Sequence, residues 1–137
     1  MKKSTLRFAV LSLALSILGA EAMAAEGAYR RTCRINGGQT WDVQIPGDQI
    51  TLCRFGGVGF TVDTYYSAKV ERTTSEAVSA FLSGPASCDQ AGGSEIDAAD
   101  LDGGSVRICR FADASIVESA ALEQGPNGAG ALARALR

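Results

Sequence analysis

The feature that most constrains this chain is an arrangement of cysteines, glycines and a phenylalanine that occurs twice. Residues 33–55 contain a cysteine, three further residues, Gly-Gly and, after a linker, Cys-Arg-Phe. Residues 88–111 repeat that order, with 20 residues between the cysteines in place of 19. All four cysteines of the 137-residue chain lie in these two copies. The arrangement therefore predicts one structural unit that is used twice.

The cysteine count indicates disulfide bonds. An even number of cysteines in a small chain is typical of exported domains that supplement a modest core with disulfides. Four cysteines allow three pairings, and a repeated unit favours the one in which each copy closes its own loop: Cys33 with Cys53, and Cys88 with Cys109. Each loop would stabilise the fold by about 3 kcal/mol in the chain-entropy model. The chain has no histidine and no closely spaced cysteine pair, so we expect neither a metal site nor a cofactor.

The first 24 residues have the organisation of a secretory signal peptide. Two lysines and an arginine precede an apolar run over residues 8–19, and Ala-Met-Ala at 22–24 offers small residues to a signal peptidase. We expect cleavage after Ala24 and a mature protein that is periplasmic or secreted. No cysteine follows the apolar run, so we do not expect a lipid anchor. No later segment approaches the roughly 18 apolar residues of a membrane span, so stable membrane insertion is not expected.

Charge is distributed unevenly along the mature chain. Residues 25–72 have a net charge of +1, whereas residues 73–125 contain nine acidic and two basic side chains, a net charge of −7. A nucleic-acid binder needs a basic face, so we expect no nucleic-acid partner. The acidic half suits a cationic protein partner, although an acidic surface also serves solubility alone.

Local patterns predict an α-β-β order in each copy. A short helix is expected to end at each Gly-Gly pair, over residues 25–36 and 85–91. Apolar and polar residues alternate over 41–45 before a Pro-Gly turn, which is typical of a half-buried strand. Residues 50–55 and 106–111 are the predicted return strands. The predicted fold class is therefore α+β: a small disulfide-stapled domain built from two repeats, each a short helix plus a β-hairpin.

Two capping-box patterns predict further helices. One helix begins within residues 73–76, ends at Gly84 and links the two repeats. The other begins at Ser115 and runs to Glu123. Residues 126–137 are predicted to be a mobile tail. The predicted organisation is a signal peptide at 1–24, a first repeat at 25–72, a linking helix and second repeat at 73–125, and the tail at 126–137.

The second copy carries an extended motif: Pro-Ala-Ser, Cys-x3-Gly-Gly, a glycine-containing turn and Cys-x-Phe-x-Asp, over residues 85–113. With Ser115 and Glu118, it resembles over about 40 residues a small cysteine-rich bacterial exported domain of unknown function labelled "putative hemolysin". The chain has Ala114, Val117 and Ala120 where that family has glycine, cysteine and tryptophan. The first copy keeps only the cysteines, Gly-Gly and Cys-x-Phe. The resemblance implies an exported domain and, through its label, a membrane-acting alternative function.

No catalytic constellation is predicted. Without histidine, neither a Ser-His nor a Cys-His pair can form, and bridged cysteines are not nucleophiles. The second hairpin contains an acidic cluster: Glu95, Asp97, Asp100 and Asp102. Paired carboxylates serve glycoside hydrolysis or calcium binding, but this cluster lacks the ligand spacing of a calcium loop. We therefore expect a solvated acidic turn, and no enzyme activity.

The acidic cluster, Trp41 and two arginines are the candidate partner-binding residues. Trp41 belongs either to an exposed aromatic patch or to the core. Arg54 and Arg110 lie at equivalent places in the motif, where they either pair with carboxylates across the repeats or bind a ligand. The predicted function is a non-catalytic exported binding module for a protein partner, such as an inhibitor of a cationic hydrolase of the lysozyme kind. Against the membrane-acting alternative, the mature chain has no basic amphipathic helix.

Overall fold

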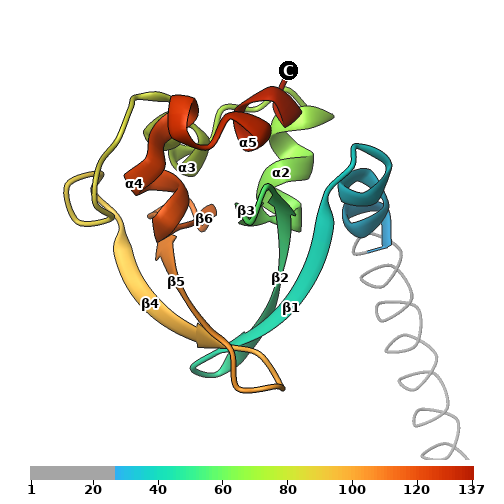
Figure 1. The fold of residues 1–137 in the computed structure, drawn as a ribbon, viewed down its shortest axis with the longest axis vertical. Helices are drawn as coiled ribbons and strands as arrows, with labels where there is room; N and C mark the ends of the chain where they lie inside the picture. The colour runs from blue at the N-terminus through green and yellow to red at the C-terminus, as the bar shows by residue number, and fades with distance from the viewer. Residues whose placement is uncertain (1–26) are drawn as a thin grey trace, which may run out of the picture.

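The strands form a closed six-stranded antiparallel barrel, and helices gather at one end of it (Figure 1). The computed structural model describes residues 27–137, so the predicted signal peptide lies outside the described residues. The strands are β1 (Gln39–Ile45), β2 (Asp48–Phe55), β3 (Val58–Thr61), β4 (Ser94–Ala99), β5 (Ser105–Arg110) and β6 (Ile116–Glu118). The helices are α2 (Val62–Lys69), α3 (Glu76–Leu82), α4 (Ser119–Gly128) and α5 (Gly130–Ala135), and residues 27–35 are also helical.

The strand order around the barrel is β1-β2-β3-β6-β5-β4. Two three-stranded meanders meet where β3 pairs with β6, through Phe60 and Val117. They meet again where β1 pairs with β4, through Gln44 and Ala99. The predicted fold class, α+β with two helix-plus-hairpin repeats, is wrong, because each half of the chain supplies three strands and both halves share one closed barrel. A two-stranded hairpin alone leaves unpaired edges, and the third strand of each half covers one of them.

The strand register gives the two halves corresponding positions. Cys53 of β2 lies opposite Phe60 of β3, and Cys109 of β5 lies opposite Val117 of β6. Phe60 and Val117 thus occupy corresponding positions in the two halves, and they also pair with each other. The residues before and after Phe60 therefore correspond to the residues before and after Val117.

Both predicted disulfides are confirmed: Cys33 is bonded to Cys53, and Cys88 to Cys109. No cysteine among residues 27–137 is free. Each bond links the segment before a hairpin to its second strand. Two structural disulfides indicate folding in an oxidising environment, periplasmic or extracellular.

The structure explains both glycines of each Gly-Gly pair. The first, Gly37 or Gly92, has a φ of about +90°, which glycine adopts without strain. The second, Gly38 or Gly93, lies against the disulfide. A Cβ at Gly38 would lie 2.7 Å from Cys33 Sγ, and one at Gly93 would lie 2.3 Å from a sulfur of the other disulfide. The pair therefore combines a chain reversal with space for the disulfide.

The core has two parts, one on each face of the sheet. The inner cluster within the barrel contains Val43, Ile45, Leu52, Ala98, Ile108 and Ile116. The outer cluster lies between the sheet and the helices, and it contains both disulfides together with Phe60, Tyr65, Phe81, Leu122 and Leu132. Successive residues of β2 and β5 point to opposite faces of the sheet, so each of these strands contributes side chains to both clusters.

The predicted hairpins are present as β1–β2 and β4–β5, and the helix predicted at 25–36 is confirmed for residues 27–35. The helix predicted at 85–91 is instead a set of turns. The linking helix exists as α3, but its N-cap is Ser75, whose hydroxyl accepts a hydrogen bond from the Val78 N–H.

Two predictions about the C-terminal part are wrong. Residues 116–118, predicted to begin a helix, form β6, because they pair with β5 and β3. The predicted mobile tail is packed: α4 has a kink at Gly125, whose backbone is not helical, and resumes up to Gly128, and α5 places Leu132 in the outer cluster with none of its surface exposed. Its alanine-rich sequence has little hydrophobic pattern of its own, so the packing depends on the cluster that receives Leu132.

Candidate functional site: two arginine positions and an acidic hairpin

Arg54 occupies a closed polar site that joins the two halves. Its Nε and Nη2 atoms each donate a hydrogen bond of 3.1 Å to the carboxylate of Glu118. Its Nη2 also donates to the carbonyl of Gly57. The guanidinium stacks 4.6 Å from the ring centroid of Trp41. The structural interpretation of Arg54, pairing with a carboxylate across the halves, agrees with this geometry.

Glu118 is the buried member of this pair, with 1% of its side chain exposed. Burial raises the pKa of Glu118, and the hydrogen bonds from Arg54 offset part of that shift. The bidentate geometry nevertheless supplies the charge partner that a buried carboxylate requires. This arginine is therefore occupied in holding the fold together.

The turn between β4 and β5 is built around Asp100. Its carboxylate accepts hydrogen bonds from the N–H groups of Asp102, at 3.0 Å, and Gly104, at 2.6 Å. Its other oxygen accepts from the indole Nε1 of Trp41 at 3.2 Å. Asp100 thus fixes the turn and attaches it to β1. Leu101, at the tip, is 90% exposed.

The other acidic residues of this hairpin do not converge. Glu95 accepts a hydrogen bond of 3.3 Å from Arg107 across the two strands, while Asp97 and Asp102 are exposed. Within residues 27–137, no group of three or more histidine, cysteine or acidic side chains is placed to hold a metal ion. The structure therefore brings together Trp41, Arg54 and Asp100, but leaves the remaining acids as separate surface charges.

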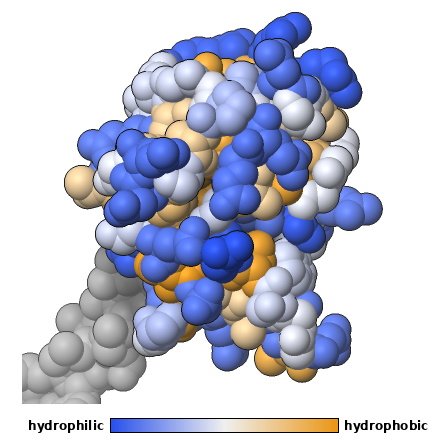
Figure 2. Space-filling view, turned by 60° about the vertical axis from the view of Figure 1, so that its left-hand side comes forward, coloured by the Kyte–Doolittle hydropathy of each residue, from blue (hydrophilic) through white to orange (hydrophobic). Residues whose placement is uncertain are grey.

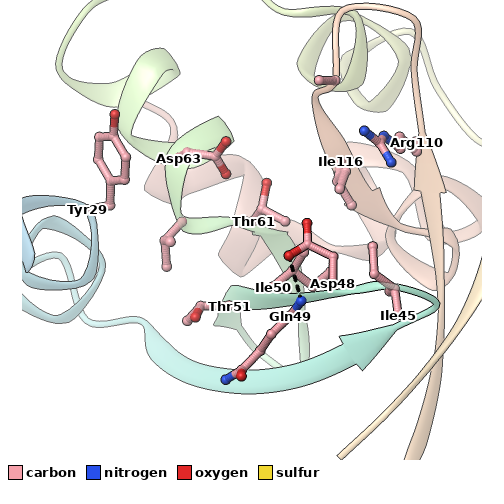
Figure 3. A pocket seen from close by; sticks show the side chains of 12 residues that line it. Tyr29, Ile45, Asp48, Gln49, Ile50, Thr51, Thr61, Asp63, Arg110 and Ile116 are labelled. Carbon is pink, nitrogen blue, oxygen red and sulfur yellow. Dashed lines mark hydrogen bonds between the residues drawn. The ribbon is translucent and has the colours of Figure 1, made fainter. Parts of the chain in front are cut away.

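Arg110 lies at a different kind of site, a cleft with a volume of about 590 Å³ (Figure 3). Arg110 and Ile116 lie on one side of it, Tyr29 and Asp63 on the other, and Asp48 between them. Its apolar lining is Ile45, Ile50, Val62 and Ile116. Among the described residues, Arg110 makes no ion pair or side-chain hydrogen bond.

One wall of the cleft is an edge of β2 that β3 does not cover. The pairing of β2 with β3 begins only at Leu52, so residues 48–51 have no strand partner on that side. A two-residue turn joins Ile45 to Asp48. In an antiparallel hairpin with such a turn, the backbone N–H and C=O groups of Ile50 point toward β1, and those of Gln49 point toward the cleft. The N–H of Gln49 is held by Asp48 Oδ1 at 2.8 Å, and its carbonyl remains available to a ligand.

The sequence interpretation missed Asp48, Asp63 and the β2 edge as parts of a site. Nothing in their local sequence marks them, since the cleft lies beside the part of β2 that β3 does not cover. The two sites present guanidinium, carboxylate, hydroxyl and apolar groups, which can bind a ligand.

Comparison with known proteins adds no family assignment. No family model, no curated protein and no solved structure matches this chain. The resemblance to the haemolysin-labelled domain therefore remains a prediction from sequence.

Proposed function

We propose that this protein is a non-catalytic binding module, exported to the periplasm or beyond, and that its β4–β5 hairpin binds a cationic protein. In its most specific form, the partner is a basic hydrolase such as a lysozyme, which the hairpin inhibits. The observation that carries the proposal is Leu101, exposed at the tip of a turn whose backbone is held by Asp100.

A turn held in place before binding loses little conformational entropy when it docks, which favours affinity. Leu101 supplies an apolar anchor for a pocket on the partner. The surrounding charge is negative, with Asp97 and Asp102 exposed on the same hairpin. Such charge steers a basic partner toward the tip and raises the association rate.

A binding assay against a panel of lysozymes and basic proteases tests the proposal. The informative variant is Leu101→Ser combined with Asp102→Asn, which leaves the Asp100 hydrogen bonds in place. We expect at least a tenfold loss of affinity, and no change with Leu82→Ser, an exposed leucine on α3. A panel with no binder at micromolar protein, or equal binding by the hairpin variant, would reject the hairpin as the binding surface.

No specific observation favours the membrane-acting alternative. Within residues 27–137, every helix is too short or too polar to cross a membrane. On the face in Figure 2, hydrophobic side chains form small areas separated by hydrophilic ones.

A further inference from the structure

The two arginines of the motif stand in corresponding positions but have different surroundings. Each follows a disulfide cysteine, Arg54 in β2 and Arg110 in β5. Phe60 and Val117 occupy corresponding positions in the strand register, and Thr61 follows Phe60 as Glu118 follows Val117. Thr61 and Glu118 are therefore corresponding residues of the two halves. Arg54 meets the Glu118 carboxylate of the opposite half. The corresponding residue on the side of Arg110 is Thr61, which has no carboxylate.

The shorter side chain leaves space at this second position. Thr61 and Arg110 both line the cleft, and the Thr61 hydroxyl is bonded to the hydroxyl of Thr64 at 2.7 Å. Because the Thr61 hydroxyl has this hydrogen-bond partner, it does not take the place of a carboxylate beside Arg110. We infer that the cleft binds the C-terminal segment of a polypeptide, whose terminal carboxylate pairs with Arg110 as Glu118 pairs with Arg54.

Two features of the cleft favour a peptide over another carboxylate. The carbonyl of Gln49 on the uncovered β2 edge can accept a hydrogen bond from a ligand amide. Ile45, Ile50 and Ile116 offer contact to an apolar C-terminal side chain. A simple carboxylate ion would use neither feature.

The charged residues that face Arg110 indicate which charge the rest of the peptide should carry. Asp48 and Asp63 also line the cleft, so an acidic peptide would be repelled while a basic residue before the C-terminus would be attracted. The site thus fits a basic peptide that ends in an apolar residue with a free carboxylate. None of residues 94–104, which include the turn at the tip of the β4–β5 hairpin, lines the cleft, so the site can be tested apart from the proposed function.

The test is an NMR titration of the ¹⁵N-labelled oxidised protein with the acetylated peptide Ala-Lys-Val-Leu, as the free acid and as the C-terminal amide. We expect the free acid to shift the amide signals of Thr51 and Ile116 and to bind about tenfold or more tightly than the amide, since the charge-assisted bidentate pair is lost with the carboxylate. Arg110→Gln should remove this preference. Arg107→Gln, on the exposed surface of the same strand and outside the cleft, should retain it.

A second variant places the missing group in the protein. Thr61→Glu introduces a carboxylate at the position that corresponds to Glu118, and should block the free acid by pairing with Arg110. Equal binding of acid and amide, an unchanged preference in Arg110→Gln, or no shift in the cleft at millimolar peptide would each overturn the inference. If Thr61→Glu fails to fold, Arg110→Gln alone decides.

N-acetyl-leucine as a further ligand separates the two sources of carboxylate. We expect it to bind more weakly than the peptide, because it lacks the backbone amides that the β2 edge would bind. Binding as tight as that of the peptide would also overturn the inference, since the peptide backbone would then contribute nothing.

Discussion

Arg54 and Glu118 form a bidentate ion pair that links β2 to β6, and thereby one half of the barrel to the other. Arg54→Met leaves a carboxylate that is almost fully buried without its cation. We expect a loss of about 3 kcal/mol in the free energy of unfolding, measured by urea denaturation at pH 7. The loss should shrink as the pH falls, because burial raises the pKa of Glu118 and a protonated carboxyl needs no cation.

The control is the double variant Arg54→Met with Glu118→Met. Replacing both charges by apolar groups should restore most of the stability. A double variant as unstable as the single one would show that shape, and not the unpaired charge, determines the loss.

Gly92 and Gly93 should differ in their tolerance of alanine. Gly92 has a positive φ but open space around its Cβ position, so Gly92→Ala should cost about 1 kcal/mol in backbone strain. Gly93→Ala places a methyl group 2.3 Å from Cys109 Sγ and should interfere with disulfide closure. Counting free thiols by alkylation and mass spectrometry checks this, and full oxidation of Gly93→Ala with wild-type stability would contradict it.

Ala114 has a φ of +69°, a conformation that costs a non-glycine residue energy. We expect Ala114→Gly to raise the free energy of unfolding by about 1 kcal/mol. Ala112→Gly, two residues earlier and not at a positive φ, should instead lower it slightly through unfolded-chain entropy. Thermal unfolding of the two variants provides the comparison, and a lower midpoint for Ala114→Gly than for wild type would contradict the strain.

Leu132 tests whether the C-terminal residues belong to the core. Because its side chain is fully buried in the outer cluster, Leu132→Ala should cost about 3 kcal/mol. Arg134→Ala, on an exposed position of the same helix, should change stability by less than about 0.5 kcal/mol. Urea denaturation distinguishes the two, and equal effects would restore the prediction of a mobile tail.

Asp42 should contribute to resistance against acid. The hydroxyl of Thr51, at 2.5 Å, and the guanidinium of Arg30, at 2.9 Å, hold the pKa of Asp42 below its usual value. A lowered folded pKa stabilises the fold above the unfolded pKa, and this stabilisation is lost as the pH falls through the folded value.

The expected difference between wild type and Asp42→Asn is therefore constant near neutral pH and disappears as the pH falls through the lowered pKa of Asp42. Its size should be about 1 kcal/mol or less, because the pair is partly exposed. Thermal melts across this pH range, with Asp97→Asn as an exposed control, provide the measurement. A difference that does not shrink as the pH falls would show that the substitution perturbs the packing and that charge is not the cause.

Much of the local structure could be read from the sequence, because its causes are local. Alternation over residues 41–45 predicted β1, and the Pro-Gly turn after it predicted the β1–β2 hairpin. The spacing of the cysteines predicted the pairing that the structure shows. The sequence could not distinguish the roles of all candidate partner-binding residues. Arg54 and Arg110 occupy equivalent motif positions, although Arg54 is paired with a carboxylate and Arg110 lines an open cleft.

By itself, the sequence determined the two disulfide loops, the hairpins they close and the acidic character of the second half. Tertiary structure alone decided that β3 and β6 join these hairpins into one barrel, since strands of four and three residues are too short to show a period. It also decided the burial of Leu132 and the difference between Glu118 and Thr61 as neighbours of the two arginines. Those features depend on contacts between segments far apart in the chain, and no local pattern specifies which segments will meet.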